Sequence, residues 1–584
     1  MKIKYLFGLA VIAAMTTSCS SNEDLGTAGS GTGTNEAGVG YATFTINLPS
    51  ASGSTTSGAR GTRATDAGGG AVVAPGTEDE YKVANATALI FQKYGSDEGS
   101  YKFVESVDLP DANVAWNDDT EEGVTKSKKL VAKLTNVDTK NTYGVLILLN
   151  NKTASGEVKI KLPTVGQSYN DWNNTALTPK VTDLAATDNF YMANAPLNES
   201  GSVTTLVTID KNNIYATSTE AESGTKAANV YVERGVAKMS IAAPGTIKVK
   251  DKATKVETKS TVDFSNWALD ITNQKTYAVH NIYGLSTDFS GIWTNARFTG
   301  TNKRIYWGKD PNYDRTELND ADDAGDTNRG KEFNFIKATS EINKAFTESA
   351  YCLENTFNLA NMYQGQTTRV IFKAKYTPKD GTSELADADG TFYTIGNMTT
   401  ILNTDKLKAA VDAVATPVLP TGYTIDYTNF KKEGSHVITL EDIKDATGAT
   451  LVAGTDYSGK TGTQIVADIN AKLGLKDGRD EAKVGINTYA KGATYYIARV
   501  KHFGDALTEW KSGENYGTEN GKYLGRYGML RNNWYELTVG NVYGPGYPDV
   551  PPVDPTLPDD ENEKYLSVSV KILSWAKRTQ SVDL

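Results

Sequence analysis

Apolar and polar residues alternate strictly along one early segment of the chain, Tyr41–Leu48. One face of this segment carries Ala42, Phe44, Ile46 and Leu48, and the other face carries Tyr41, Thr43, Thr45 and Asn47. Alternation with a period of two is typical of a β-strand with one buried face. The pattern therefore predicts a half-buried strand, followed by a stretch, 50–72, in which Gly, Ser, Ala and Thr dominate and no packed element is expected.

Short apolar runs recur along the rest of the chain, separated by Gly, Asn and Asp turns. Helical periodicity is rare, and only Thr404–Val414 and Thr463–Leu473 are predicted as helices. Abundant Tyr, Thr and Val suit sheets, so the pattern predicts an all-β protein with sandwich architecture. The expected strands are Ala86–Gln92, Tyr143–Asn150, Ser202–Ile209, Asn229–Ile241, Thr368–Tyr376, Thr494–Arg499 and Trp534–Val539.

The chain ends with one more alternating segment, which a proline-rich stretch separates from the body. Its apolar residues are Leu566, Val568, Val570 and Ile572 on one face, and Trp575 after them. Prolines at the density of residues 544–558 enforce an extended linker with about 40 Å of reach. A strand placed in this way either folds back onto its own domain or pairs with an edge that another molecule supplies. Composition alone leaves both interpretations open.

The first residues have the form of an export signal. A basic start, an apolar run over Tyr5–Met15 and small residues before Cys19 make 1–19 a secretory signal, too short to span a bilayer. The cysteine at the cleavage point predicts a lipoprotein signal, in which Cys19 is lipidated and becomes the new N-terminus. The alternative is an ordinary signal peptide that contains a cysteine, and Thr16 departs from the usual leucine of a lipoprotein signal.

The same patterns predict how the chain is organised. We expect two β-sandwiches, with the boundary in the turn-rich stretch Ser218–Ala228. Two arginines, Arg60 and Arg63, interrupt the unpackable loop after the first strand. The expected parts are a signal (1–19), a flexible tether (20–40), the first strand and its loop (41–63), an N-terminal sandwich (64–228), a C-terminal sandwich (229–543), a Pro-rich acidic linker (544–564) and the last strand (565–584).

Charge and composition narrow the function classes. A net charge of −10 and a pI near 5.2 argue against nucleic acid as a partner. With Cys19 lipidated, only Cys352 remains, so no disulfide is expected within the chain. The three histidines, His280, His436 and His502, show no metal-ligand spacing. We therefore expect no enzymatic activity, no cofactor and no metal.

Two acidic loops are candidate cation sites by composition. Asn319–Asp326 resembles a calcium loop in composition, but it lacks the Glu that closes a twelve-residue calcium site. Asp387–Gly390 has the composition of a turn. We expect both to be ordinary loops, the first of them solvated.

The most distinctive stretches of the chain are Arg531-Asn-Asn-Trp-Tyr535 within Leu530–Leu537 and the ending, Leu566–Trp575 with Ser581–Leu584. These stretches resemble the fimbrillin family of type V pilins, and within it the major subunit of the short (minor) fimbriae. Asn229–Ser240 is similar as well, and weaker similarities fill the interval, so the resemblance covers nearly the whole mature chain. The weaker ones are Asn141–Asn150, Asn189–Pro196, His280–Leu285, Tyr351–Thr356, Gln366–Pro378 and Thr494–Arg499.

The resemblance implies two stacked transthyretin-like β-sandwich domains and a route of processing. The precursor would reach the cell outer membrane as a lipoprotein, and an Arg-specific surface protease would cut after Arg60 or Arg63. The family loop normally offers one clear arginine and this loop offers two, so the sequence leaves both bonds open. The cut would release the first strand and open a groove, which the terminal donor strand, 565–584, of another copy or of a related fimbrial subunit would fill.

The expected function is therefore that of a stalk subunit of an extracellular fimbria, which supports adhesion and biofilm formation. Loss of the large apolar side chains of the first strand would uncover ~5–9 kcal/mol of burial, comparable with the stability of a whole domain. Donor and acceptor lie on different parts of one molecule, so their contact builds an open filament. The alternatives are a tip or accessory pilin, or a monomeric lipoprotein adhesin that binds glycan or host protein. A stalk subunit needs both a removable first strand and a spare last strand, and this sequence has both.

Overall fold

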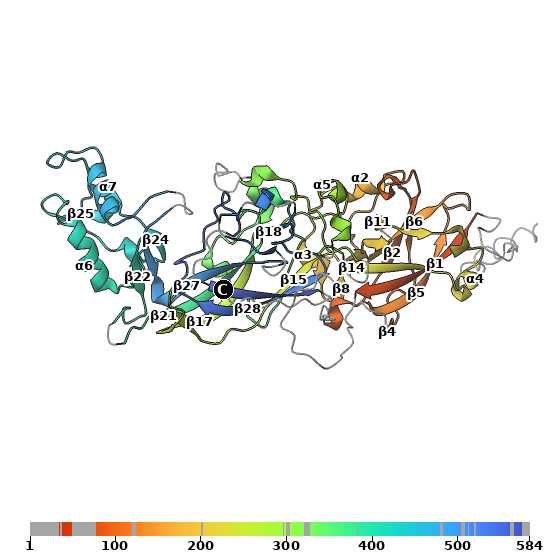
Figure 1. Ribbon diagram of the computed structural model, residues 1–584, viewed down its shortest axis with the longest axis horizontal. Coiled ribbons are helices and arrows are strands. Elements are labelled where there is room, and N and C mark those ends of the chain that lie inside the picture. The colour runs from red at the N-terminus through yellow and green to blue at the C-terminus, as the bar shows by residue number, and fades with distance from the viewer. Residues whose placement is uncertain are drawn as a thin grey trace, which may run out of the picture. The chain divides into compact units, whose positions relative to one another are not determined.

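The structure, a computed structural model, describes residues 34, 38–49, 77–118, 124–199 and 202–560 with short gaps, and the backbone of 566–574. The gaps fall at 296, 300–303, 320–327, 382–383, 479–482, 504–507, 512, 515 and 519–520. Sheets predominate and α-helices are few (Figure 1), which confirms the all-β prediction. Within these residues, a helix with the length and apolar character needed to cross a membrane is not found.

The described chain divides into two compact units. Unit 1 holds the described residues up to Val236 and the later segment Tyr277–Gly308. Unit 2 holds Ala237–Thr276 and the described residues from Lys309 onward. The division lies after Val236 rather than at the predicted boundary, Ser218–Ala228, because the strand that starts at Ala228 pairs with strands of unit 1.

Unit 1 consists mainly of strands with four short helices. Its helices are α2 (Tyr169–Asn173), α3 (Val181–Leu184), α4 (Ser218–Ser223) and α5 (Leu285–Asp288). Its strands are β1 (Gly40–Pro49), β2 (Ala86–Gln92), β3 (Lys102–Asp108), β4 (Asn117–Asp118), β5 (Val124–Leu134), β6 (Tyr143–Leu149), β7 (Ala185–Ala186), β8 (Asn189–Phe190), β9 (Met192–Asn194), β10 (Leu197–Glu199), β11 (Ser202–Thr204), β12 (Val207–Ile209), β13 (Ile214–Tyr215) and β14 (Ala228–Arg234).

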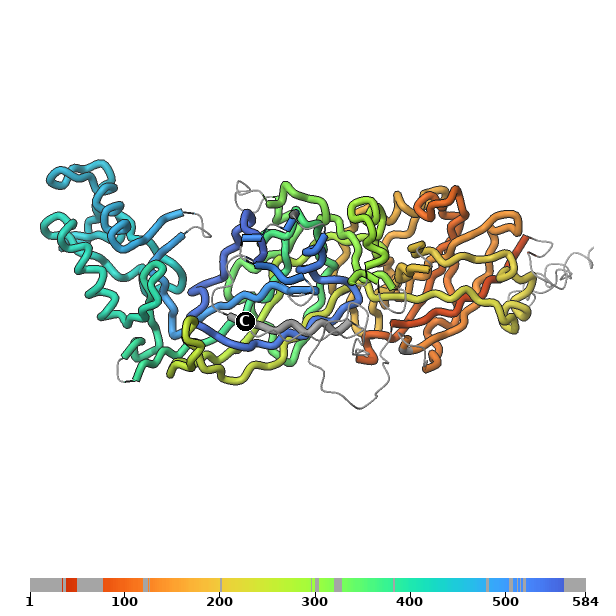
Figure 2. The backbone as a smooth tube through the Cα atoms, viewed as in Figure 1, coloured from red at the N-terminus to blue at the C-terminus, as the bar shows by residue number. Residues whose placement is uncertain are grey.

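One ten-stranded sheet organises unit 1, in the order β3-β2-β6-β9-β14-β1-β5-β4, with β12 beside β6 and β13 beside β1. The pair β2 and β6 is antiparallel and buried on both faces, as expected for strands with continuous apolar runs. The strand β14 pairs with β1 through its first half and with β9 through its second half. In Figure 2 the red strand β1 runs alongside the strands that pair with it.

Unit 2 carries the longest strands and the two longest helices, α6 (Thr404–Ala415) and α7 (Gly462–Lys472). Its strands are β15 (Ala237–Ile241), β16 (Ile247–Lys250), β17 (Glu257–Asp270), β18 (Thr272–Asn273), β19 (Phe333–Asn334), β20 (Ala350–Cys352), β21 (Arg369–Thr377), β22 (Phe392–Ile395), β23 (Tyr423–Ile425), β24 (Gly434–His436), β25 (Ile443–Asp445), β26 (Ile486–Tyr489), β27 (Ala493–Arg499), β28 (Asn533–Val542) and β29 (Leu566–Ser574).

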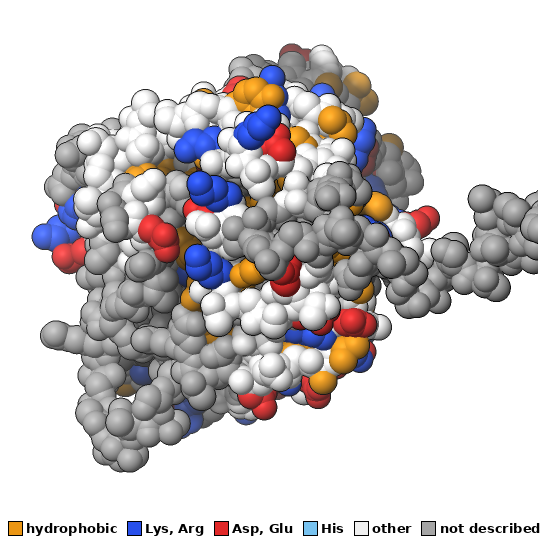
Figure 3. Space-filling model, turned by 90° about the vertical axis from the view of Figure 1, so that its right-hand side faces the viewer, with side chains coloured by type: hydrophobic (Ala, Val, Ile, Leu, Met, Phe, Trp, Pro, Cys, Tyr) orange, Lys and Arg blue, Asp and Glu red, His pale blue; other side chains and the backbone are white. Residues whose placement is uncertain are grey.

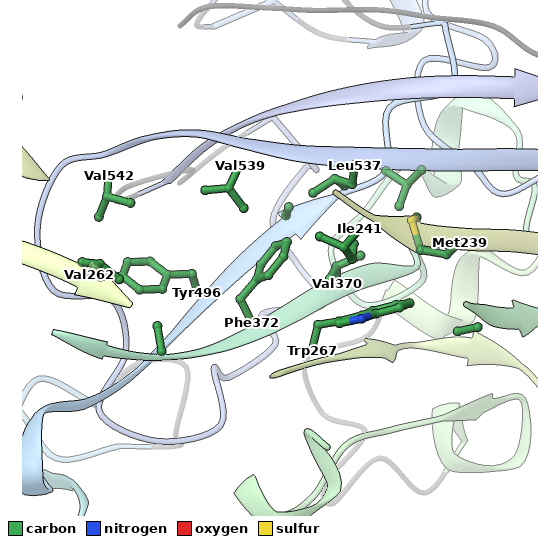
Figure 4. Packing of buried hydrophobic residues seen from close by; sticks show 14 of the residues in the cluster. Met239, Ile241, Val262, Trp267, Val370, Phe372, Tyr496, Leu537, Val539 and Val542 are labelled. Atoms are coloured by element: carbon green, nitrogen blue, oxygen red, sulfur yellow. The ribbon is translucent and has the colours of Figure 1, made fainter. Parts of the chain in front are cut away.

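An eight-stranded sheet in the order β20-β15-β28-β16-β17-β21-β27, with β29 beside β28, encloses the main core of unit 2. Buried residues from these strands, among them Trp267, Phe372 and Tyr496, pack against Leu537 and Val539 of β28 (Figure 4). The strand β28 runs parallel to β15 and β16 and antiparallel to β29. Residues that are far apart in the sequence therefore build this core.

A small subdomain is inserted between β21 and β27. It contains the sheet β22-β26-β24, the pair β23-β25 and both long helices. These elements enclose an apolar core of their own, to which α6 contributes Leu407 and Val411 and α7 contributes Ile465 and Ile469. Figure 1 shows them gathered at one end of unit 2. The sequence patterns did not predict this subdomain as a separate body.

The two predicted helices are confirmed as α6 and α7. Asn403 caps α6 by accepting the backbone N–H of Lys406, and Thr461 forms a capping box with Gln464 at the start of α7. Both caps satisfy N–H groups that lack intrahelical partners. The short helices α2 to α5 were not predicted, because four to six residues are too few to show a helical period.

Most predicted strands are confirmed within one or two residues at each end. The prediction Asn229–Ile241 is wrong as one strand, because the chain passes from unit 1 to unit 2 between Arg234 and Ala237. The prediction Ser202–Ile209 also splits, into β11 and β12. At both sites the apolar pattern continues across the break, so periodicity gives no sign of it.

Candidate functional site

The first strand, β1, is an interior strand of unit 1. It pairs antiparallel with β5 along its length and parallel with β14 from Phe44 to Asn47. Beside Tyr41 and Ala42, its neighbour is β13. Because β1 has partners on both edges, the sheet order of unit 1 would be divided between β14 and β5 without it.

Both faces of β1 are buried. The predicted apolar face, which consists of Ala42, Phe44, Ile46 and Leu48, is at most 1% exposed. On the other face only Thr45 is half-buried, so the prediction of a half-buried strand is wrong. The polar groups there find backbone acceptors: Thr43 Oγ1 donates to the carbonyl of Ala221 in α4 (2.8 Å) and Asn47 Nδ2 to that of Val230 in β14 (3.3 Å).

This burial makes β1 costly to remove. Phe44, Ile46 and Leu48 are each at most 1% exposed, and together they contribute ~5–9 kcal/mol of apolar burial. Two strand ladders add backbone hydrogen bonds on both edges. A domain is stable by only ~5–15 kcal/mol, so unit 1 depends on this strand or on a replacement for it.

The last strand, β29, pairs with its own unit. It runs antiparallel to β28, with Leu566 opposite Val542 and Ser574 opposite Asn533. The strands β15 and β16 pair with the other edge of β28. Within the single chain, the last strand thus folds back onto its own unit. This is the first of the two arrangements that the sequence left open.

The register of this pair sets the positions of the predicted donor face opposite buried residues of β28. Val568, Val570 and Ile572 lie opposite Val539, Leu537 and Tyr535, respectively. Those three β28 residues are at most 8% exposed, and Figure 4 shows Leu537 and Val539 among the core side chains. A slip of one residue would exchange the two faces of β29, so a buried β28 face specifies the register strongly.

The Arg-Asn-Asn-Trp-Tyr motif brings the chain into β28. Arg531 forms a buried ion pair with Glu354, whose Oε2 is 2.9 Å from Nε. Asn532 has a φ of 57°, in the left-handed region that asparagine tolerates. The amide of Asn533 donates to the carbonyl of Arg531 (2.8 Å). The first three residues of the motif therefore build a tight, buried turn that fixes where β28 begins.

The two aromatic residues of the motif anchor the strand itself. Trp534 Nε1 donates to Ser240 Oγ (2.7 Å), and the ammonium group of Lys238 lies 4.0 Å from the centre of a Trp534 ring. The hydroxyl of Tyr535 accepts the N–H of Leu530 (2.9 Å) and is 2.8 Å from Nδ1 of His502. These contacts hold β28 against β15 and the core, and so position the edge to which β29 is paired.

Residues 544–560, which we call the strap, follow β28 and are docked on unit 2. Tyr496 and Tyr489 donate their hydroxyls to the carbonyls of Gly544 and Gly546 (both 2.9 Å). Tyr547 exchanges two backbone hydrogen bonds with Tyr495 of β27. The expected free linker with a reach of about 40 Å is therefore corrected: the segment is extended, but these bonds and those described next hold it on its own unit.

Arginine Arg369 holds the middle of the strap. Its guanidinium donates to the carbonyls of Pro551 (2.6 Å) and Pro552 (3.1 Å). The same guanidinium pairs with Asp270 at 2.8 Å, and both side chains are 1% exposed. Two proline carbonyls of the strap are therefore bound by a side chain and not by a strand ladder.

Two aspartates hold the end of the strap. Asp560 receives both Nε and Nη2 of Arg526 (2.7 and 2.6 Å) and the hydroxyls of Tyr516 and Tyr527 (2.9 and 2.8 Å). Asp559 is fully buried. It accepts the hydroxyl of Thr367 at 2.5 Å and lies 3.4 Å from Nε of Arg499. Bidentate contacts between arginine and carboxylate are among the strongest hydrogen bonds in proteins. We call these four side chains, Arg499, Arg526, Asp559 and Asp560, the clamp.

Burial and the charges of the clamp shift the pKa of Asp560 and that of the neighbouring Tyr516. Burial raises the pKa of Asp560, but the hydrogen bonds and charge of Arg526 outweigh it, so the pKa lies below its ordinary value. Burial, together with the charges of Asp559 and Asp560, raises the pKa of Tyr516 well above its ordinary value. Asp560 is therefore ionised and Tyr516 neutral at physiological pH, as their hydrogen bond requires.

Several predicted site residues lie outside the described residues. These are Cys19, Arg60, Arg63 and Trp575, and the acidic loop from residue 320 to 326. The carboxylate of Asp389 accepts the N–H of Thr391 (2.9 Å), as in a turn, and that of Asp387 accepts the N–H of Thr404 at the start of α6 (2.9 Å). No group of His, Cys, Asp and Glu among the described residues could hold a metal ion.

Four arginines that organise the C-terminal part were not predicted from the sequence: Arg369, Arg499, Arg526 and Arg531. Each is at most 3% exposed and faces a buried carboxylate. A signal was available in the run Asp559–Glu563, which was interpreted as part of the linker. Only the fold shows which of these carboxylates meets an arginine.

The surface view gives no sign of the apolar residues of β1. In Figure 3, Lys, Arg, Asp and Glu side chains are scattered over the visible described face, and hydrophobic atoms form small separate groups. The apolar side chains of β1 are inside.

Comparison with known proteins supports a family assignment for the C-terminal part. Residues 487–581 match the family described as major fimbrial subunit protein type IV, fimbrillin, C-terminal, and this range holds β27, β28, the strap and β29. No curated protein matches the chain.

Two solved structures from Parabacteroides distasonis are similar at 11% identity. One, a putative cell adhesion protein, covers 93% of this chain and 99% of its own with a TM-score of 0.34. The other, a fimbrial assembly protein, covers 59% of this chain and 82% of its own with a TM-score of 0.28. Both scores are too low for an inference about this chain. By the family match and the motifs within it, the C-terminal region of the protein, residues 487–581, is similar to the C-terminal part of the fimbrillins.

Proposed function

We propose that the protein is a structural subunit of a surface fimbria and that it polymerises by exchanging strands with other copies of itself. The observation that carries the proposal is the position of β1. The strand at the start of the described chain is buried on both faces and paired on both edges, and the loop predicted to follow it in the sequence contains Arg60 and Arg63. A cut in that loop would convert an integral core strand into a separable one.

The proposed donor is the last strand, β29. It occupies a single edge, beside β28, at the end of the described chain. β-Strand addition supplies backbone hydrogen bonds for affinity and side-chain pockets for specificity. Both strands carry alternating apolar residues, so a vacated β1 position and a β29 from another copy are complementary in pattern.

The proposal includes the route to the surface. Export as a lipoprotein with lipid on Cys19 would hold the precursor at the outer membrane, and an Arg-specific protease would then cut after Arg60 or Arg63. The fragment that leaves would carry the lipid with it. The polymer would be extracellular, with each body in a transthyretin-like sandwich form, and would support adhesion. A stalk position is proposed because this chain has both a removable first strand and a spare last strand.

The direct test measures binding of the donor to an opened subunit. The subunit is cut with limited trypsin, and a fluorescent peptide of residues 565–584 is added while β1 is displaced with mild denaturant. We expect stable incorporation of the peptide and release of the β1 fragment. A matched peptide with Ile572→Asp should fail, because an unpaired carboxylate in the groove costs several kcal/mol. Equal binding of both peptides, or of neither, would rule out strand exchange.

The cellular test is electron microscopy of cells with and without the protein. Filaments should be present only in cells that make it, and antibodies to the body should label them along their length. A Cys19→Ser precursor should lose acyl label, and a double variant Arg60→Ala/Arg63→Ala should stay monomeric. Label at the filament tip alone would contradict the stalk position and would favour a tip or accessory subunit.

A further inference from the structure

The strap makes separate contacts with unit 2 from its beginning to its end. The tyrosines beside β27 hold its beginning, Arg369 holds its middle and the clamp holds its end. Every one of these partners belongs to unit 2 and precedes residue 544 in the chain. None of the contacts involves β29, so the strap can stay in place whether or not β29 is paired with β28.

The strap also covers a sheet edge. The strand β27 is at one end of the sheet order of unit 2, and the strap pairs with it at Tyr495 and Tyr547. A Cβ on Gly546 would lie 2.1 Å from the carbonyl oxygen of Tyr495, so the close approach requires glycine. Exposed edges invite pairing with other chains, and prolines are a common means of preventing it. Release of the strap would expose this edge as well as lengthen the tether of β29.

The clamp fixes the point from which the last strand departs. Leu566 follows Asp560 by six residues, and six residues span at most about 20 Å. With the strap docked, a donor strand can therefore reach only an acceptor that begins within about 20 Å of Asp560. With the strap undocked, the chain from Gly544 onward would reach several times farther and sample many wrong orientations.

We propose that Asp559 and Asp560, held by Arg499 and Arg526, are positioning residues that keep the strap on its own unit while β29 exchanges, so that each donor strand is delivered from a fixed origin. This inference rests on the proposed strand exchange. In this proposal the clamp sets the position from which the donor strand starts. Only the donor strand itself binds the groove. A short tether from a fixed origin raises the effective concentration of the strand at a correctly placed acceptor.

The first test uses the intact, uncut monomer and does not depend on assembly. A double variant, Arg526→Met/Asp560→Leu, removes both charges, so that neither is left buried without its partner. Hydrogen exchange of peptides from 548–560 is followed, together with that of β28 as an internal reference. We expect the backbone amides of Asp559 and Asp560, which are bonded to Met362 and Tyr516, to exchange at least tenfold faster, with β28 unchanged. Unchanged exchange in the strap would overturn the proposal.

Two further variants control this result. Asp549→Asn removes one negative charge from an exposed position of the same strap, and it should exchange like the wild type. Arg526→Lys keeps the charge but cannot form the bidentate contact, and it should be intermediate. Equal acceleration by Asp549→Asn would show that net charge, rather than the clamp, holds the strap, and would overturn the proposal.

The second test separates the clamp from the exchange itself. Opened subunits of the double variant should bind a free peptide of residues 565–584 as well as the wild type does, because a free peptide is not tethered to the strap. Their own polymerisation should fall at least tenfold in rate, with irregular subunit spacing in the filaments that form. Polymerisation at the wild-type rate and spacing would overturn the role of the clamp. Failure of the peptide to bind wild-type subunits would instead overturn the proposed function.

Discussion

The first and last strands of the described chain differ in how firmly each is held. β1 has partners on both edges and both of its faces are buried in unit 1, whereas β29 is paired with β28 alone in unit 2. Removal of β1 would uncover a core, and removal of β29 would uncover one edge. Under the proposed exchange, the first strand would be freed only after the chain is cut, while the last strand could leave its edge without a broken peptide bond.

The strongest way to break this comparison is to place a charge in each strand. Ile46→Asp puts a carboxylate at a position that is 0% exposed, and we expect unit 1 to lose at least ~4 kcal/mol of stability, from lost burial and an unpaired charge. Chemical denaturation followed by circular dichroism measures the loss. The control is Thr45→Asp on the same strand, where the side chain is half-buried, and we expect a loss of about 1 kcal/mol. Equal losses would mean that β1 is not an interior strand.

A smaller effect on stability is expected when the last strand is deleted. A chain that lacks residues 565–584 should keep both units folded, because the strap and the clamp remain, but it should form no filament beyond a capped pair with intact subunits. Gel filtration and electron microscopy measure the outcome. An unfolded unit 2 would show that β29 is as integral as β1, and the comparison would fail.

A single charge in the last strand should act on assembly more than on folding. Ile572 lies opposite the buried Tyr535 and Lys571 opposite the half-buried Glu536. Ile572→Asp should therefore nearly abolish polymerisation, while Lys571→Asp should slow it only a few-fold. Light scattering after the cut measures the two rates. If both substitutions had the same effect, the two faces of the strand would not be distinct.

The smallest expected effect is a response of the strap to acid. The first strand should not show this response. The pKa of Asp560 is lowered in the folded protein, so its stabilising contribution is present above the unfolded value near 4 and is lost as the pH falls through the folded value. β1 contains no carboxylate. Between pH 4.5 and 2.5 we expect cleavage by pepsin within the strap to rise a few-fold before cleavage at β1. Asp560→Asn should abolish this dependence on pH.

The sequence predicted the strands well where the pattern is local. The boundaries of β2 are reproduced without change, and those of β21 and β27 within one residue, because alternation and turn residues set them. Pairing over long range was not predictable: β14 runs parallel to β1, and β15 to β28, and nothing near these strands specifies the partner. Thr43 and Asn47 were placed on an exposed face, although they find backbone acceptors inside.

Only the part of the candidate site that depends on local alternation was predicted. The apolar face of β1 and the range of the last strand follow from alternation and were identified by residue. The strap was not, because proline content indicates an extended backbone but gives no information about what the backbone touches. Arg369 and Arg526 are separated from their strap partners by long stretches of chain, and composition does not reveal which charges become buried together.

The contacts at the end of the strap determine where a mechanical load would enter the body. Tension on a last strand held by a neighbouring copy would travel back along the chain and meet Asp560 first, where two parallel N–H···O bonds join it to Arg526. Farther along lie the two proline carbonyls bound by Arg369. The covalent path thus passes through charged, multiply bonded junctions before it reaches β28. A fibre built in this way would resist pulling through its ion pairs, and acid that protonates Asp560 would weaken it under load sooner than at rest.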